Sequence, residues 1–197
     1  MFTITLPYVP DAEGALQLAK ELDSDKSARF PELEAIIATS AYQSLVYALT
    51  VLYERFEQGE AMIATNPDHA YQYAKRIIKG AWPEGEAVIA TECDTAYNYA
   101  MYIKKAPFPE GEKVIAADAN RSYDYARWIL KGRFEQGEAA ITANATLKKF
   151  YYHFLDELGI YTTESILKQI AETYNVSIEV VKDIAKLYQQ VGIIEVE

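Results

Sequence analysis

The sequence repeats itself every 26 residues, and this period constrains the fold more than any other feature. The stretch GEAVIATECDTAYNYAMYIKK begins at Gly85, and closely similar stretches begin at Gly59 and Gly111. Gly137 opens a fourth copy, and Glu34 marks a fifth copy upstream on the same spacing. A fixed period of this length is typical of a solenoid, in which each unit buries its apolar face only against its neighbours. We therefore expect an all-α solenoid of about five to six helix-turn-helix repeats.

The first half of each repeat predicts a short helix that ends at a turn. An aromatic residue precedes the helix, prolines such as Pro83 and Pro109 stand near its first position, and acids lie at its positive end. A column of polar residues follows, four of which are preferred N-cap residues. Its members are Ser40, Asn66, Glu92, Asp118 and Asn144. A second helix is therefore expected to begin at this column.

The second half of each repeat predicts a helix of about 13 residues. Small or apolar residues recur at i, i+3, i+4 and i+7, the stripe of a helix that faces a core. One copy of this stripe is Ala96, Tyr99, Ala100 and Ile103. We expect Gly80 and Gly132 to end their helices in a left-handed conformation.

The two ends of the chain differ from the repeats. Residues 2–6 alternate apolar and threonine side chains as a strand does, and residues 193–196 suggest a second short strand. We expect an N-terminal strand and capping helix in residues 1–29, the repeats in 30–157 and a helix-turn-helix-like capping segment in 158–197. Unpaired strands at both ends predict self-association into a homo-oligomer, whereas strands that lie against their own terminal helices would leave a monomer.

Residues 165–188 resemble the helix-turn-helix of DNA-binding regulators. On the second of these helices Lys182 and Lys186 are offset by Glu179 and Asp183, and a recognition helix needs Arg, Lys, Asn or Gln on base edges. Glu164 and its neighbours still fit the columns of the repeat. We interpret the segment as a divergent final repeat, and a DNA-binding transcriptional regulator is the alternative function.

Composition narrows the classes of partner. The formal net charge of −10 opposes a broad phosphate-binding surface, so we do not expect nucleic acid as a partner. The same charge suits binding to a basic partner or solubility alone. The single Cys93 excludes an internal disulfide, and no apolar run is long enough to cross a membrane. We expect a soluble, cytoplasmic protein with no membrane partner.

The sequence contains no motif of an active site. His69 and His153 occupy unlike places in the repeat and have no second ligand at helical spacing, so we expect no metal site. The recurrent glutamates are spaced by neighbouring helices, too far apart to share one ion, and arginines such as Arg55 and Arg133 are their expected partners. We expect no catalytic residue and no cofactor. An enzyme with an unrecognised site stays the third possibility.

The motif RFEQGEAMIAT, followed by AYQYAKRIIKG, resembles short tandem α-helical repeats found in many bacteriophage-encoded and some bacterial proteins. The resemblance covers about 130 residues, so it spans most of the predicted solenoid. It implies a phage origin, an α-solenoid and a location in the host cytoplasm, and it brings no catalytic residues. Small phage proteins without enzymatic motifs often bind a host protein, including components of antiviral defence. The resemblance therefore implies a protein partner from the host.

Positions that vary between copies indicate where a partner would bind, because the constant columns build the scaffold. Met, Tyr, Trp and Arg, which are enriched at the centres of interfaces, stand in these variable columns on the second helices. The predicted partner-binding residues are Arg76, Met101, Tyr102, Arg127 and Trp128.

Overall fold

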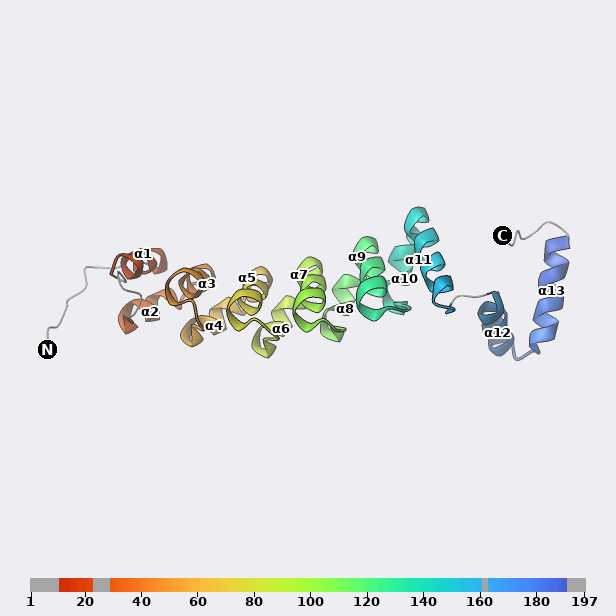
Figure 1. Ribbon diagram of the computed structural model, residues 1–197, viewed down its shortest axis with the longest axis horizontal. Helices are drawn as coiled ribbons and strands as arrows, with labels where there is room; N and C mark the ends of the chain where they lie inside the picture. The colour runs from red at the N-terminus through yellow and green to blue at the C-terminus, as the bar shows by residue number, and fades with distance from the viewer. Residues whose placement is uncertain (1–10, 23–28, 161–162, 191–197) are drawn as a thin grey trace. The chain divides into compact units, whose positions relative to one another are not determined.

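The computed structural model describes residues 11–22, 29–160 and 163–190, and every regular element in these ranges is a helix (Figure 1). The two predicted strands, and with them the predicted pairing of the chain ends, lie outside the described residues. The chain divides into two compact units between Thr142 and Ala143. No helix in the described ranges is long and apolar enough to span a lipid bilayer. The predicted all-α repeat fold is confirmed, and the predicted domain limits stay predictions.

Each repeat of the first unit is a hairpin of two helices. The first helices are α2 (Pro31–Ile37), α4 (Glu57–Ile63), α6 (Pro83–Ile89), α8 (Pro109–Ile115) and, in the fifth repeat, the 3-10 turn η5 (Glu135–Gly137) with α10 (Glu138–Ala143). The second helices are α3 (Ala41–Tyr47), α5 (Pro67–Tyr73), α7 (Cys93–Tyr99) and α9 (Ala119–Asp124). These four lie side by side along one side of the row, and α2, α4, α6 and α8 form the other side (Figure 1).

The turn between the two helices is fixed by the predicted N-cap column. Asn66 Oδ1 accepts the amide of His69 at 3.0 Å, and Asp118 Oδ1 accepts that of Arg121 at 2.8 Å. Glu92 is not a preferred N-cap residue, yet its carboxylate reaches the amides of the second helix as well. All five side chains of the column accept such a bond, which confirms the predicted helix start.

The second helices widen into π-helical turns and end in a left-handed residue that is not glycine. The π-helical segments are η1 (Ala48–Leu52), η2 (Ala74–Ile78), η3 (Ala100–Lys104) and η4 (Tyr125–Leu130). The left-handed residues that follow them are Tyr53, Lys79, Lys105 and Lys131, with φ of 57°, 57°, 52° and 51°. The prediction for Gly80 and Gly132 is therefore wrong by one position. Each of these glycines instead donates its amide to the carbonyl six residues back.

The repeats approach one another at a column of glycines. A Cβ on Gly111 would lie 2.8 Å from the Cβ of Ala96, and one on Gly137 would lie 2.6 Å from Ser122 Oγ. Ala96 and Ser122 belong to the second helix of the preceding repeat, so small residues on both sides allow this contact. The isoleucine column is fully buried beside it, as Ile89 illustrates.

The first repeat carries Leu33 where later repeats carry glycine, because its neighbour is a different element. That neighbour is α1 (Ala12–Leu22), which confirms the predicted helix of the N-terminal cap. It packs on α2 and α3 and buries Ala15, Leu16 and Ala19, and Leu33 is also fully buried. A leucine fills the space that an α1 lined by small side chains leaves open.

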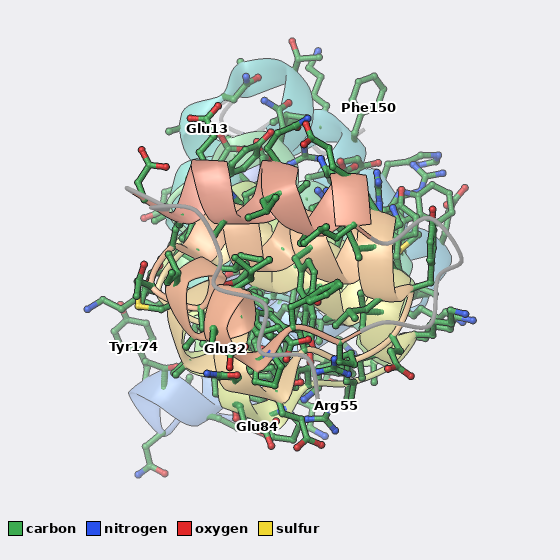
Figure 2. The ribbon with its side chains drawn as sticks, turned by 90° about the vertical axis from the view of Figure 1, so that its left-hand side faces the viewer. Glu13, Glu32, Arg55, Glu84, Phe150 and Tyr174 are labelled. Carbon is green, nitrogen blue, oxygen red and sulfur yellow. The ribbon has the colours of Figure 1, made fainter. Side chains whose placement is uncertain are left out.

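Acidic and basic side chains project from the row on the side of the first helices. Figure 2 looks along the row and shows Glu32 of α2, Arg55 and Glu84 of α6 on this side, with Glu13 of α1 on the opposite side. Acids in the first turn of a helix interact favourably with its positive end. Glu13, Glu32 and Glu84 are such acids, since they lie in the first turns of their helices.

The second unit contains α11 (Ala145–Glu157), α12 (Thr163–Tyr174) and α13 (Ile178–Gln190). α12 and α13 pack together and bury Ala171 and Val181, and Asn175 turns the chain between them with φ of 51°. The divergent-repeat interpretation is not supported, because α12 continues without a break through Ile170, the position where the repeats have their N-cap turn.

We predict that Gly111→Ala lowers the free energy of unfolding by about 1 to 3 kcal/mol, because the added methyl group overlaps Ala96 and Phe108. Gly80→Ala is the matched control. A Cβ there meets no atom within 4 Å, so its effect should stay within about 0.5 kcal/mol or be slightly stabilising. Urea denaturation followed by circular dichroism measures both. Equal destabilisation by the two variants would contradict the close approach of the repeats.

Candidate functional site

The recurrent glutamate belongs to a hydrogen-bonded group that is repeated in successive hairpins. In the third repeat, the Tyr99 hydroxyl accepts the amide of Trp82 at 2.8 Å and donates to Glu86 Oε1 at 2.9 Å. In the fourth repeat, Tyr125 does the same with the amide of Phe108 and with Glu112 at 2.7 and 3.0 Å. Tyr73 forms the corresponding pair of bonds in the second repeat. Burial and the adjacent carboxylate raise the pKa of these tyrosines, which therefore stay protonated.

Each of these glutamates also has a cationic or amide partner. Arg55 donates two bonds of 2.8 Å to Glu60, and Arg133 pairs with Glu138 at 2.5 Å, which confirms the predicted arginine partners. In the third repeat Lys104 takes this role at 3.0 Å from Glu86. The hydrogen bonds from Arg55 lower the pKa of the Glu60 carboxyl against the opposing effect of burial. A carboxylate held by a cation and a tyrosine stabilises the hairpin and is not available as a general base.

The histidines and the cysteine form no reactive group. In the described ranges no three His, Cys, Asp or Glu side chains are grouped so that they could hold a metal ion. His69 lies against the ring of Tyr42, and the exposed His153 is 3.4 Å from Glu157. Burial raises the pKa of the Cys93 thiol to about 11, so the nucleophilic thiolate is scarce at neutral pH.

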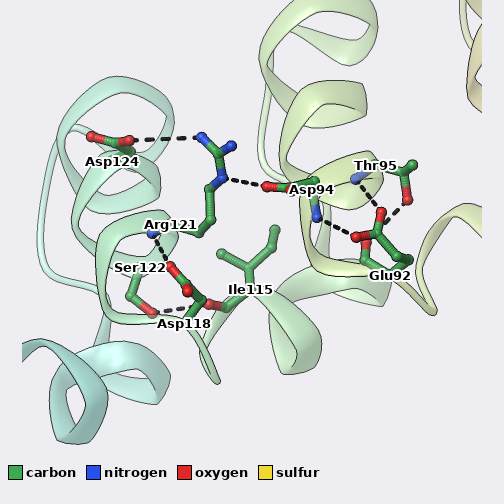
Figure 3. Close-up of polar contacts among 8 residues, drawn as sticks. All are labelled: Glu92, Asp94, Thr95, Ile115, Asp118, Arg121, Ser122 and Asp124. Atoms are coloured by element: carbon green, nitrogen blue, oxygen red, sulfur yellow. Dashed lines mark hydrogen bonds and ion pairs between the residues drawn. The ribbon is translucent and has the colours of Figure 1, made fainter. Parts of the chain in front are cut away.

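A polar cluster joins the starts of the second helices in the third and fourth repeats (Figure 3). Arg121 donates to Asp94 at 2.6 Å, lies 4.0 Å from Asp124 and covers the ring of Tyr97 at 4.8 Å. One arginine therefore neutralises two acids of neighbouring repeats. The cluster ties the repeats together and leaves no free carboxylate pair for catalysis.

The predicted partner-binding residues lie on the surface, in the π-helical ends of the second helices. Tyr102 is 56% exposed and Trp128 is 52% exposed, whereas the scaffold tyrosines are fully buried. Arg76 and Arg127 are exposed, and Met101 is half-buried. The five residues come from η2, η3 and η4, which are consecutive in the row.

Contacts between repeats join these side chains into one continuous surface. Lys75 Nζ of the second repeat lies 5.6 Å from the centre of the Tyr102 ring of the third repeat. Met101 of the third repeat and Trp128 of the fourth line a hollow of about 340 Å³. The Arg127 guanidinium lies 5.0 Å from the centre of the Trp128 ring. In the first two cases a side chain of one repeat meets the next position of the following repeat, and the third contact lies within the fourth repeat.

The predicted set of partner-binding residues lacks four lysines of this surface. Lys105 and Lys131 line the hollow beside Trp128, Lys75 lies over Tyr102, and Lys79 is the exposed left-handed residue of its repeat. The recurrence of lysine at 79, 105 and 131, exactly one period apart, is the signal that could have found three of them. The surface is named the aromatic–basic ridge below. It consists of Lys75, Arg76, Lys79, Met101, Tyr102, Lys105, Arg127, Trp128 and Lys131.

The α12–α13 pair has a different character from the ridge. Lys182 is 3.4 Å from Glu179 on the same helix, so part of the basic charge of α13 is neutralised. Val180, Ile184 and Leu187 are about half exposed, and an apolar groove of about 680 Å³ lies between the two helices. An apolar face suits a helix or another apolar surface better than the polar edges of bases.

Comparisons with protein-family models, with curated proteins and with solved structures gave no match. No activity, ligand or partner is therefore transferred from a relative. The side chains described above have to carry the functional assignment by their own chemistry.

We predict that Tyr99→Phe lowers the free energy of unfolding by about 1 to 3 kcal/mol, because it leaves the buried amide of Trp82 without an acceptor. Tyr102→Phe is the matched control, since the Tyr102 hydroxyl makes no hydrogen bond within the described part of the chain. Its effect should stay within about 0.5 kcal/mol. Urea denaturation gives both values, and a neutral Tyr99→Phe would show that the hydroxyl is not needed for stability.

We predict that Glu60→Gln changes how stability depends on pH. The pKa of Glu60 is lowered in the folded protein, so its contribution is complete above the unfolded value of about 4.5 and is lost as pH falls through the folded value. The variant should be less stable by about 1 kcal/mol near neutral pH, and the difference should shrink in acid. Glu57→Gln, at an exposed carboxylate of the same helix, is the control. A difference between Glu60→Gln and wild type that stays constant from neutral pH into acid would contradict the assignment.

Proposed function

We propose that the protein is a non-enzymatic α-helical repeat module that binds another protein through the aromatic–basic ridge. The observation that carries the proposal is the exposure of Tyr102 and Trp128 on adjacent repeats. Large aromatic rings in contact with water are disfavoured by about 25 cal/mol per Å² of apolar surface. Rings of this kind gain free energy when a partner covers them.

The scaffold has no need of these two rings. The core between successive hairpins is built by a buried tyrosine and a buried aromatic residue of the next repeat, such as Tyr99 and Phe108, whose ring centres are 5.2 Å apart. At the position of Tyr102 and Trp128 the first two repeats carry Thr50 and Arg76. A column that accepts threonine, arginine, tyrosine and tryptophan is not specified by packing, so its composition is free to serve binding.

The ridge has the composition of an interface centre. Trp, Tyr and Arg dominate the residues whose truncation weakens protein–protein binding most, and Met is enriched with them. Met101 and Trp128 share one hollow, and Arg127 stacks beside it. A hollow with an aromatic wall accepts an apolar side chain of the partner, and the cations around it orient polar groups.

The resemblance of the repeat motif to phage-encoded repeat proteins supports a bacterial host protein as the partner. A component of antiviral defence is one such host protein. In this setting the module acts in the host cytoplasm, by occupying a surface of its partner and without a reaction of its own.

A DNA-binding regulator that acts through α12 and α13 is the alternative. The two helices joined by a short turn support it, but the pairing of Lys182 with Glu179 and the exposed apolar face weigh against it. Sequence-dependent, submicromolar binding to duplex DNA at physiological salt would favour this alternative.

We predict that Tyr102→Ala and Trp128→Ala each weaken partner binding by about 2 kcal/mol or more and change stability by less than about 0.5 kcal/mol. The measurement is affinity capture from host lysate with wild type and variants as bait, with captured proteins identified by mass spectrometry. Tyr42→Ala, an exposed tyrosine near the start of α3, is the matched control and should retain the wild-type set. A protein set unchanged in both ridge variants would rule out the ridge as the binding surface.

A further inference from the structure

The three segments that form the aromatic–basic ridge contain basic residues and no acids. Residues 74–79, 100–105 and 125–131 hold seven Lys or Arg and no Asp or Glu, although the chain as a whole has a net charge of −10. These stretches are the π-helical ends η2, η3 and η4 with the left-handed residues that follow them. The local charge of the proposed binding surface is therefore opposite to the charge of the protein.

Six of these seven cations form no salt bridge with a carboxylate in the described ranges, and Lys104 is the exception. Lys75 and Arg127 form hydrogen bonds to tyrosine hydroxyls and lie over aromatic rings, and the charge of Arg127 also acts on Asp124. Elsewhere in the first unit the arginines are neutralised, as the pairs Arg55–Glu60 and Arg121–Asp94 illustrate. The unpaired cations of the ridge are Lys75, Arg76, Lys79, Lys105, Arg127 and Lys131.

We propose that the partner presents an acidic, extended polypeptide segment that lies along the ridge, with its carboxylates on the unpaired cations and apolar side chains against Tyr102 and Trp128. This inference rests on the proposed function and specifies the chemistry of the partner. Charge complementarity is its basis, since each of these six cations gains a salt bridge that it does not form within the protein.

The spacing of the repeats fits an extended chain. Neighbouring packed helices lie about 8 to 10 Å apart, and an extended chain advances about 3.3 Å per residue, so each repeat corresponds to about three residues of the partner. Side chains at every third position then meet equivalent places on η2, η3 and η4. One apolar residue in each triplet of the partner would contact the aromatic column of the ridge, and the acids between these apolar residues would contact the cations.

A polypeptide fits the ridge better than a nucleic acid does. Acids stand at the starts of the same second helices, so a long polyanion that extends beyond the ridge meets repulsion that a short acidic segment avoids. These acids are Asp68, Asp94 and Asp118. The unpaired cations occupy only three repeats, which is short of a broad phosphate-binding surface.

The helix dipole gives a competing account of the same charges. Cations near the C-terminus of a helix stabilise it by a few tenths of a kcal/mol, whether or not a partner exists. In that case reversing the charge of Lys105 or Lys131 would change stability and leave peptide binding unaltered. Binding and stability therefore separate the two accounts.

The test is fluorescence anisotropy of a labelled peptide of four Asp-Glu-Leu triplets, which spans about four repeats. We expect binding at about 50 mM salt that weakens steeply as salt rises, and no binding of the same peptide built from Asn-Gln-Leu triplets. The double variant Lys105→Glu with Lys131→Glu should weaken binding at least about tenfold. Lys113→Glu, at an exposed lysine of α8 away from the ridge, should have less than about a twofold effect.

Three results would overturn the inference. The first is no binding of the acidic peptide at about 1 mM, and the second is equal loss of binding in the ridge variant and in Lys113→Glu. The third is tighter binding of a single-stranded oligonucleotide of equal charge than of the peptide at physiological salt. Each variant is checked by circular dichroism and urea denaturation, so that a folding defect is not taken for lost binding.

The capture experiment distinguishes failure of the acidic-partner inference from failure of the proposed protein-binding function. Suppose that host proteins captured by wild type are lost from the Trp128→Ala bait but kept by the double charge-reversal bait. The ridge would then bind a protein, and the acidic character of the partner would be wrong. If both baits instead retained every captured protein, the proposed binding function of the ridge would be ruled out.

Discussion

The tyrosine hydroxyl at the centre of each hairpin is the interaction on which the rest of the structure depends. Tyr99 accepts the amide before α6, donates to Glu86, and places its ring 5.2 Å from Phe108 of the next repeat. One side chain thus fixes the entry of the first helix, holds the carboxylate and contacts the following hairpin. The same arrangement recurs at Tyr73 and Tyr125, so the order passes from repeat to repeat without contacts between residues far apart in the sequence.

The glycine column brings neighbouring repeats close enough for their side chains to form one surface. Because Gly111 lets α8 approach Ala96 closely, the second helices lie near enough for a side chain of one repeat to reach the next. Lys75 over Tyr102 and Met101 beside Trp128 are consequences of this spacing. Residues about 26 positions apart therefore become neighbours, and the aromatic–basic ridge is built from positions that no local motif would group together.

Much of this architecture could be predicted from the sequence because the chain carries its own copies. The capping side chains, the buried isoleucines and the arginine partners of Glu60 and Glu138 all follow from columns that repeat. The π-helical ends and the left-handed Lys79 could not be predicted, because glycine is the usual left-handed residue and Gly80 stands one position later. For residues 163–174 the 26-residue period predicts a turn at Ile170, whereas the helix-turn-helix resemblance predicts a continuous helix. The structure has the continuous helix α12. The aromatic and arginine residues of the ridge could be predicted from their residue types. Their contacts across repeats could not, because these depend on the distance between neighbouring helices.

The position of the ridge follows from the same scaffold. Amides and carbonyls of parallel second helices point the same way, so every negative helix end lies along one edge of the row. Cations are favoured at that edge and acids are disfavoured, whereas the opposite ends bear Asp68, Asp94 and Asp118. Ala100 is the last fully buried residue of its helix, so packing places few demands on the residues that follow it. The helix dipole still favours positive charge at these positions. A stack of this kind favours a basic edge even in an acidic chain. Tyr102 and Trp128 lie on that edge, which is why we propose it as the surface for an acidic partner.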